Sequence, residues 1–302
     1  MKPWKNRIEY AALRTVTRIV QKLAPATVVK IGRLLGNIVY YCIPIRKSVV
    51  LENIARAMPE ISKKRRRQIA RGTYVMFGQN FFEFLRTPVR SSEELAHRVI
   101  LHNLDVLHKA QASGNGTLLM SGHFGNWEMA GCAFVAAGFP LVVIARKQRN
   151  LLVDDMINAF RRSAGIETAP LGMGIREFLR ALKQNKFVGL LADQDAHSEG
   201  VFVDYFNVPS ATAPGPALLS LRTGADIVFF SCIQRKDGRY DLFFEKIPTD
   251  DVSGATEENI RIITQRHVAK LEDKVRRWPD HWFWMHRRWK TAPPEDYSSL
   301  QI

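Results

Sequence analysis

Cysteine is scarce in this chain of 302 residues: Cys42, Cys132 and Cys232 lie far apart, each among apolar neighbours. Neither their number nor their spacing fits a set of zinc ligands or a disulfide framework. The sequence therefore excludes a small disulfide-stabilised scaffold and favours a reducing compartment. With 46% hydrophobic residues, the chain can bury a sizeable core in one large domain or two small ones.

The sequence also lacks an uninterrupted apolar run of the ~18 residues that a clean transmembrane helix needs. The best candidate, residues 28–45, contains Lys30, Arg33 and Asn37. The N-terminus is basic, but charged residues interrupt any apolar segment and no small-residue cleavage site follows, so we expect no signal peptide.

The N-terminal segment carries an amphipathic pattern instead. Its apolar residues fall on one face of a predicted helix: Ile8, Ala11, Ala12, Val16, Ile19, Val20 and Leu23. Basic residues cover the rest of that helix: Lys5, Arg7, Arg14, Arg18 and Lys22. The pattern is typical of a membrane surface, and it also fits a helix packed on the domain with a solvated basic face. We predict a helical, membrane-associating region at 1–95, with an interfacial or shallow anchor, and an α/β domain at 96–302.

Acidic residues are outnumbered, because 44 Lys and Arg against 29 Asp and Glu give a net charge of +15. Such an excess favours an anionic partner: nucleic acid, anionic lipid or an acidic protein. The basic run at 63–67 is short and closely followed by aromatic residues, so it does not resemble a nucleic-acid tail. A positive helix face near anionic headgroups is the alternative.

Short apolar segments alternate with helix-forming segments between about residues 100 and 250. We predict strands at 117–120, 141–144, 187–191 and 227–230, helices at 153–164 and 175–184, and a β-hairpin that joins 228–234 to 240–244. This alternation favours an α/β fold with a mixed, mostly parallel sheet flanked by helices. A long helix is predicted at 260–278, with Ile263, Val268, Leu271 and Val275 facing inward.

A histidine stands where the strand at 117–120 ends and the next helix begins. In open α/β folds, ligands bind at this edge of the sheet. His123 can act as a base near neutral pH, and Glu128 can turn back to hydrogen-bond its ring. Backbone N–H groups near Gly125, or a cationic side chain, are expected to hold an oxyanion. No Ser or Cys lies in a nucleophile elbow, so we expect direct attack by a substrate hydroxyl. The alternative is a core histidine followed by an ordinary first-turn acid.

Further polar residues follow neighbouring predicted strands. Arg146 comes after the strand at 141–144 and can bind a phosphate. Asp193 and Asp195 come after the strand at 187–191. Two carboxylates can hold a divalent metal, but one loop lacks the ligand count of a dedicated site, so acceptor positioning or local structure is favoured.

The segment 281–290 combines aromatic and basic residues, Arg287 among them. That combination suits a membrane interface or stacking on single-stranded nucleic acid. It also suits a C-terminal segment that covers the core, which we favour.

The segment 122–128 (GHFGNWE) resembles the His-x4-acid motif of the glycerolipid acyltransferase superfamily and, more closely, of the bacterial lipid A biosynthesis (lauroyl/myristoyl) acyltransferase family. Further segments resemble that family in order: 53–60, 145–150, 192–195, 201–206, 213–217 and 284–290. The resemblance covers nearly the whole chain. It implies transfer of an acyl chain, usually from acyl carrier protein, to a hydroxyl of a membrane glycolipid such as a lipid A precursor. We expect the acyl transfer to take place at the cytoplasmic face of the inner membrane.

The resemblance implies two catalytic residues, His123 and Glu128, and no metal or other cofactor. The residues expected to bind substrate are Gly125, Asn126, Arg146, Asp193, Asp195 and Arg287. Coenzyme A thioesters remain an alternative donor, and other glycolipids or lysophospholipids remain alternative acceptors. Two further alternatives are a thioesterase and a non-enzymatic, basic membrane-surface or nucleic-acid-binding protein. The ordered motifs argue against the last, because charge alone needs none of them.

Overall fold

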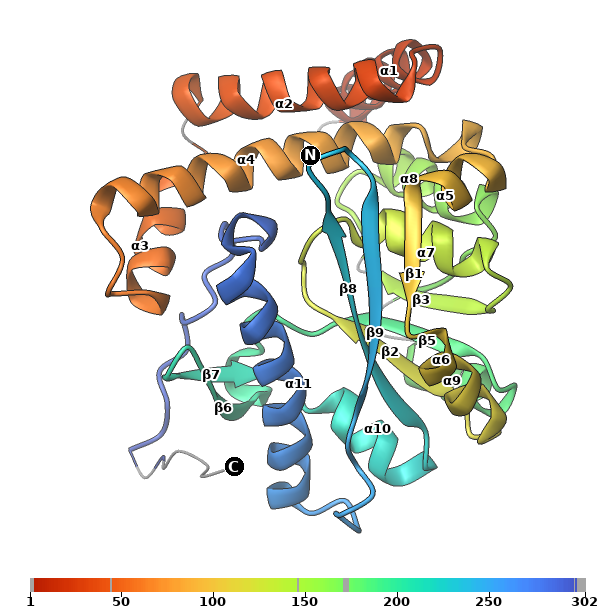
Figure 1. Cartoon of the computed structure of the whole chain (residues 1–302), viewed down its shortest axis with the longest axis vertical. Coiled ribbons are helices and arrows are strands. Elements are labelled where there is room, and N and C mark those ends of the chain that lie inside the picture. Colours follow the sequence, from red (N-terminus) through yellow and green to blue (C-terminus); the bar gives the residue numbers. More distant parts are fainter. Residues whose placement is uncertain (1–2, 44, 146, 171–173, 296, 298–302) are drawn as a thin grey trace.

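The computed structural model describes residues 3–43, 45–145, 147–170, 174–295 and 297, and a mixed sheet lies at the centre of this part of the chain (Figure 1). Its seven described strands have the order β1-β9-β8-β2-β5-β3-β4. They are β1 (Val99–His102), β2 (Thr117–Ser121), β3 (Leu141–Ala145), β4 (Glu167–Pro170), β5 (Phe187–Leu191), β8 (Asp226–Gln234) and β9 (Tyr240–Ile247). Strands β8, β2, β5, β3 and β4 are parallel, β9 is antiparallel to β8, and β1 is parallel to β9.

Helices flank the sheet, which confirms the predicted fold class. They are α1 (Pro3–Gln21), α2 (Pro25–Cys42), α3 (Lys47–Ala57), α4 (Lys63–Leu85), α5 (Ser92–Arg98), α6 (Leu104–Ala112), α7 (Trp127–Ala136), α8 (Leu151–Ser163), α9 (Gly174–Lys183), α10 (Gly215–Thr223) and α11 (Glu257–Arg277), with short 3-10 helices at Thr87–Val89, His197–Glu199 and Pro279–His281. A separate antiparallel hairpin, β6 (Val201–Tyr205) and β7 (Val208–Thr212), lies beside α11 (Figure 1).

Both faces of the sheet are buried, which is why its central strands are mainly apolar. Successive side chains of a strand point to opposite faces. In β2, Leu119 therefore joins the core under α6 and α7, while Leu118 and Met120 join the core under α9, α10 and α11. The four inward residues predicted for α11 are each 4% exposed or less: Ile263, Val268, Leu271 and Val275.

The predicted strands correspond to β2, β3, β5 and β8, and the predicted hairpin is β8–β9. The predicted helices at 153–164, 175–184 and 260–278 correspond to α8, α9 and α11. The pattern missed β1 and β4, which have four residues each, and the β6–β7 hairpin.

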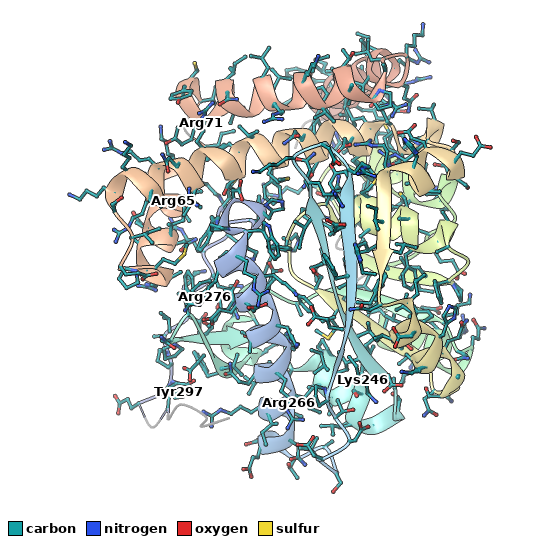
Figure 2. The ribbon with its side chains drawn as sticks, in the orientation of Figure 1. Arg65, Arg71, Lys246, Arg266, Arg276 and Tyr297 are labelled. Atoms are coloured by element: carbon teal, nitrogen blue, oxygen red, sulfur yellow. The ribbon has the colours of Figure 1, made fainter. Side chains whose placement is uncertain are left out.

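Helix α2 lies along α4 at backbone contact distance (Figure 1). Glycines make this possible: a Cβ on Gly36 would lie 2.4 Å from the carbonyl oxygen of Tyr74. A Cβ on Gly78 would lie 2.4 Å from the carbonyl oxygen of Gly32. Arg71 of α4 also reaches α2, where its Nε donates to Asn37 (Figure 2). The close packing holds α2 firmly on α4.

The outer faces of α1 and α2 expose large apolar side chains. They are Trp4, Ile8, Val16 and Ile19 in α1, and Leu34, Leu35, Ile38 and Tyr41 in α2. Within the described residues, no single helix has the length and apolar character to cross a membrane; α2 and α3 meet these criteria only together, with a bend of 94° between them.

We predict that Gly36→Ala destabilises the protein although alanine favours a helix by about 1 kcal/mol over glycine. The new methyl group would meet the backbone of Tyr74 and Val75, which can yield only if the helices part, and such overpacking costs about 1–3 kcal/mol. Thermal unfolding measures the effect. Gly215→Ala, in the first turn of α10, is the matched control, because a Cβ there meets nothing within 4 Å. A melting temperature unchanged or raised by Gly36→Ala would contradict the proposed packing constraint.

Candidate active site

His123 lies just beyond the C-terminal end of β2, in the turn that leads into α7. Gly125 permits this turn, because its φ is +59° and a Cβ there would lie 1.8 Å from the carbonyl oxygen of Cys232. Asn126 caps α7 by accepting a hydrogen bond from the N–H of Met129 at 3.0 Å. Gly125 and Asn126, both expected to bind substrate, thus shape the loop that carries His123.

The ring of His123 is held by Asp193. Its Nδ1 lies 2.7 Å from Oδ1 of Asp193, and its backbone N–H donates to Oδ2 at 2.8 Å. The indole N–H of Trp282 also donates to Oδ2, at 2.8 Å. Strand β5, which precedes Asp193, pairs directly with β2, so the two side chains meet at one sheet edge. With Nδ1 engaged, Nε2 of His123 is the nitrogen left to exchange a proton with a ligand.

The electrostatics of this pair favour a charged imidazole. Burial alone would lower the pKa of His123, but the charge and hydrogen bond of Asp193, with a smaller contribution from Glu128, raise it above its ordinary value. Burial opposes ionisation of Asp193, yet the charge of His123 and hydrogen bonds from His123 and Trp282 lower the pKa of that carboxyl to about 2. Asp193 is therefore ionised at neutral pH and stabilises the imidazolium.

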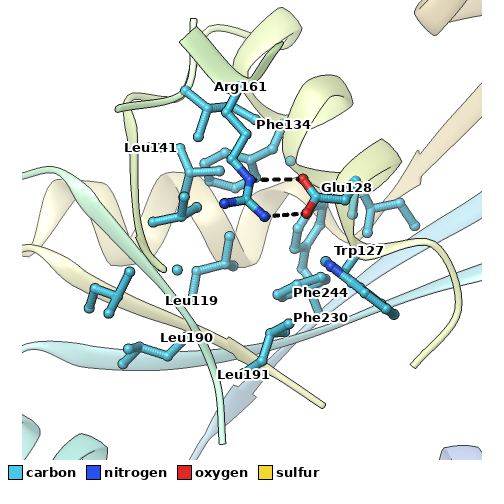
Figure 3. Close-up of a pocket in the computed structure, with 17 residues that line it drawn as sticks. Leu119, Trp127, Glu128, Phe134, Leu141, Arg161, Leu190, Leu191, Phe230 and Phe244 are labelled. Carbon is cyan, nitrogen blue, oxygen red and sulfur yellow. Dashed lines mark hydrogen bonds and ion pairs between the residues drawn. The ribbon is translucent and has the colours of Figure 1, made fainter. Parts of the chain in front are cut away.

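Glu128 does not hydrogen-bond the ring of His123, and this expectation was wrong. Its carboxylate forms a two-point ion pair with Arg161 of α8, with Oε1 2.5 Å from Nη2 and Oε2 3.1 Å from Nε (Figure 3). The reason is local: Glu128 is the second residue of α7 and its side chain reaches α8, while Asp193 already occupies Nδ1. Glu128 acts on His123 only through its charge.

The expected oxyanion donor at Gly125 is also engaged elsewhere. The N–H of Gly125 donates to the carbonyl of His281 at 2.8 Å, and that of Asn126 donates to Cys232 at 3.2 Å. In the described chain, the backbone N–H groups of Trp127 and Glu128, which open α7, donate to no carbonyl. Among the described residues, these groups and Arg161 remain as candidates for anion stabilisation.

The remaining residues expected to bind substrate are Arg146, Asp195 and Arg287. Arg146 lies outside the described residues. Asp195 is buried and holds the C-terminal segment: its Oδ2 accepts from Thr291 at 2.9 Å, and its N–H donates to His286 at 2.8 Å. Arg287 is exposed and forms no hydrogen bond or ion pair within the described part of the chain.

The arginine next to Arg287 has the structural role that we expected for the C-terminal segment. Arg288 is 1% exposed and donates to the carbonyl of Ala211 and the hydroxyl of Thr212 in β7. The sequence contains no periodicity here that would separate the exposed arginine from the buried one.

Two apolar cavities meet at the Glu128–Arg161 ion pair. The larger, of about 390 Å³, lies beside His123 between α1, α4 and α8; its apolar wall includes Leu13, Phe77, Phe81, Phe84, Met156 and Phe160. The narrower, of about 90 Å³, lies between α7 and the sheet (Figure 3); its wall includes Leu119, Phe134, Leu141, Phe230 and Phe244. Trp127, Glu128 and Arg161 line both. The site therefore combines a base with apolar space for a long hydrocarbon.

A buried acid that the sequence analysis did not identify supports the site loop. Glu83 of α4 is 2% exposed and accepts hydrogen bonds from Arg98, Asn126 and Tyr240. It thereby ties the cap of α7 to α4, α5 and β9. In the sequence, the only indication of this buried carboxylate is a single acid inside the aromatic run at 81–84.

No group of three or more His, Cys, Asp or Glu side chains in the described residues is arranged to hold a metal ion. Asp193 and Asp195 both have protein partners instead.

Comparison with known proteins relates this sequence to a family. The sequence model of a family described as bacterial lipid A biosynthesis acyltransferase matches residues 7–291. A phosphatidylinositol mannoside acyltransferase of Mycobacterium tuberculosis (strain ATCC 25618 / H37Rv) is 29% identical over 219 residues, which cover 70% of this chain and 67% of the relative. Two Escherichia coli (strain K12) proteins are also similar. The lipid A biosynthesis palmitoleoyltransferase is 26% identical over 85% of this chain and 82% of its own length. The lauroyltransferase is 24% identical over 91% of this chain and 89% of its own length.

We predict that Asp193→Asn lowers the pKa of His123, because the neutral amide no longer stabilises the imidazolium. NMR titration of the His123 ring measures the change. Asp241→Asn is the matched control, since Asp241 pairs with His102 at 2.8 Å away from this site. A His123 pKa that stays the same in Asp193→Asn, with the fold intact, would contradict the assigned electrostatics.

Proposed function

The chain belongs to the bacterial lipid A biosynthesis acyltransferase family, and from this premise we propose that it transfers a fatty acyl chain from an acyl thioester to a hydroxyl of a membrane glycolipid. Family membership makes the protein an acyltransferase. The observation that carries the finer proposal is the pairing of His123 with Asp193 beside an apolar cavity of about 390 Å³. A base next to hydrocarbon-sized space suits a lipid substrate.

In the proposed reaction, Nε2 of His123 takes the proton of the acceptor hydroxyl as its oxygen attacks the thioester carbonyl. Asp193 orients the ring and stabilises the imidazolium. The tetrahedral oxyanion then collapses, the carbon–sulfur bond breaks, and the leaving thiolate takes the proton back from His123. The products are an ester and a thiol, and the base is restored.

A covalent enzyme intermediate on either of the two buried cysteines has little support. Burial raises the pKa of both Cys132 and Cys232, which disfavours the reactive thiolate at neutral pH. Direct attack by the acceptor hydroxyl needs no nucleophile from the protein.

Among the described residues that line the two cavities, Arg161 is the cation that we propose to stabilise the oxyanion. Its guanidinium lines both cavities and is already held in a fixed orientation by Glu128. We propose that Glu128 acts through Arg161 rather than on the ring of His123. The free N–H groups of Trp127 and Glu128 at the start of α7 add to the positive potential.

We propose acyl carrier protein as the donor and a lipid A precursor as the acceptor. The net charge of +15 would favour an acidic carrier, and coenzyme A thioesters are the alternative. Because similar proteins are named for acylation of lipid A or of phosphatidylinositol mannosides, we propose to test both classes of lipid as acceptors. The exposed apolar side chains of α1 and α2, together with nearby basic residues, support contact with the cytoplasmic face of the inner membrane.

The decisive experiment incubates the full-length protein in detergent with acyl carrier protein that bears a radiolabelled acyl chain. Each acceptor is tested separately: lipid A precursors, lysophospholipids and glycosylated phosphatidylinositols. We expect a labelled lipid whose rate of formation falls about 10²–10⁴-fold in His123→Ala, the usual contribution of a general base. His97→Ala, at an exposed position in α5, is the control. Free fatty acid as the sole product would indicate a thioesterase, and activity that is indifferent to His123 would refute the mechanism.

The chain-length preference should reveal which cavity holds the acyl chain. Because the larger cavity touches His123, we expect Met156→Trp, which fills its wall, to shift the preferred donor to a shorter chain. Gly131→Val narrows the smaller cavity instead, because a Cβ on Gly131 points at Ile166 from 3.2 Å. Competition between donors of different lengths measures both variants. A shift in Gly131→Val alone would place the chain under α7.

A further inference from the structure

A small polar cavity lies next to Asp193, beneath α11. Its volume is about 10 Å³, and its polar lining comes from Ser121, Asp193, Tyr205, His267 and Arg288. These side chains belong to β2, the loop after β5, β6, α11 and the C-terminal segment. All five residues are 5% exposed or less, so they are shielded from bulk water.

Four polar atoms of this cavity have no hydrogen-bond partner among the described residues: Oγ of Ser121, the hydroxyl of Tyr205, Nε2 of His267 and Nε of Arg288. A buried polar atom without a partner costs about 1–3 kcal/mol. Other buried atoms of the chain also lack partners, but the residues that carry these four come from separate elements and line one space. Their convergence indicates a shared ligand.

The ligand must be small and able both to donate and to accept hydrogen bonds. Two hydroxyl groups, a guanidinium N–H and an imidazole nitrogen offer that mixture. Asp193 adds a further acceptor: His123 and Trp282 supply three hydrogen bonds to its carboxylate, which has about four acceptor positions. A cavity of about 10–15 Å³ with two to four polar partners fits one water molecule.

We propose that this cavity holds one fixed water molecule, which links Ser121, Tyr205, His267 and Arg288 to Asp193 and so positions the carboxylate that orients His123. This inference rests on the proposed role of His123 as the base. Ser121, Tyr205 and His267 are then positioning residues, because they reach the reacting atoms only through Asp193.

Water fits better than an ion. Asp193 is ionised and would repel an anion, while Arg288 would repel a cation. Burial and the charge of Arg288 lower the pKa of His267 to about 4, so its ring is neutral at physiological pH. Its Nε2 can then either accept or donate a hydrogen bond, according to the tautomer.

A high-resolution crystal structure of the unaltered protein tests the occupant directly. We expect one density peak within hydrogen-bonding distance of at least three of the four unpaired atoms, and no anomalous signal there after a bromide soak. A dry cavity in which the polar atoms pair with one another, or a bound bromide, would overturn the proposal. This result does not depend on the enzymatic assay, so absence of acyl transfer would refute the proposed function and leave the water proposal testable.

Paired serine variants test whether the water matters for catalysis. Ser121→Ala removes a hydroxyl from the cavity, and we expect kcat to fall about fivefold with KM unchanged, the equivalent of one hydrogen bond of about 1 kcal/mol. Ser231→Ala is the matched control: its hydroxyl is also buried and has no partner among the described residues, but Ser231 does not line the cavity. Equal effects of the two variants would contradict a positioning role.

Histidine variants supply an independent test with a built-in rescue. His267→Phe removes the ring nitrogen at similar volume and should lower kcat, whereas His267→Gln keeps a polar group and should recover most of it. Circular dichroism and thermal unfolding identify any variant that fails to fold, and the crystallographic result stands in that case. Folded His267→Phe protein with unchanged kcat would contradict the inference.

Discussion

The hydrogen bond between His123 and Asp193 organises the site because it joins parts of the chain that are distant in sequence. The two residues follow neighbouring parallel strands, and their 2.7 Å contact requires β2 and β5 to be adjacent in the sheet. The C-terminal segment completes the arrangement, since Trp282 donates to Asp193 and the N–H of Phe283 donates to the carbonyl of His123. The segment rich in tryptophan and arginine is therefore part of the site as well as a cover for the core.

Two carboxylates act on one histidine in this arrangement, and their surroundings separate their roles. Asp193 is buried and receives hydrogen bonds that keep it ionised. Glu128 is bound to Arg161, so its charge reaches His123 only at a distance. Without Arg161, Glu128 would lie unpaired between two apolar cavities, which is costly for a charge. The ion pair lets a charged residue occupy the boundary between two apolar cavities.

Local pattern predicted much of this structure, and tertiary packing decided the rest. The apolar segments at 117–120 and 187–191 predicted buried strands, and parallel strands bring His123 and Asp193 to one edge. Which carboxylate would reach the ring was not predictable, because the direction of Glu128 depends on where the fold places Arg161 of α8. Nor could the sequence separate exposed Arg287 from buried Arg288. It also could not reveal that the carboxylate of Glu83 accepts hydrogen bonds from three side chains.

Helix α4 connects the N-terminal helices to the site. The backbone of α4 around residues 74–79 contacts Gly32 and Gly36 of α2 closely. The C-terminal half of α4 also supplies Phe77, Phe81 and Phe84 to the cavity beside His123. Helix α1 contributes Leu13 to the same wall while it exposes Ile8 and Ile19 on its surface. If these outer faces rest on a bilayer, as we propose, α1 contacts the bilayer through its exposed side and contributes to the apolar wall of the cavity through Leu13. A long acyl chain could then stay in contact with apolar surface from the bilayer to the base, and exposing its methylene groups to water would cost about 0.8 kcal/mol each.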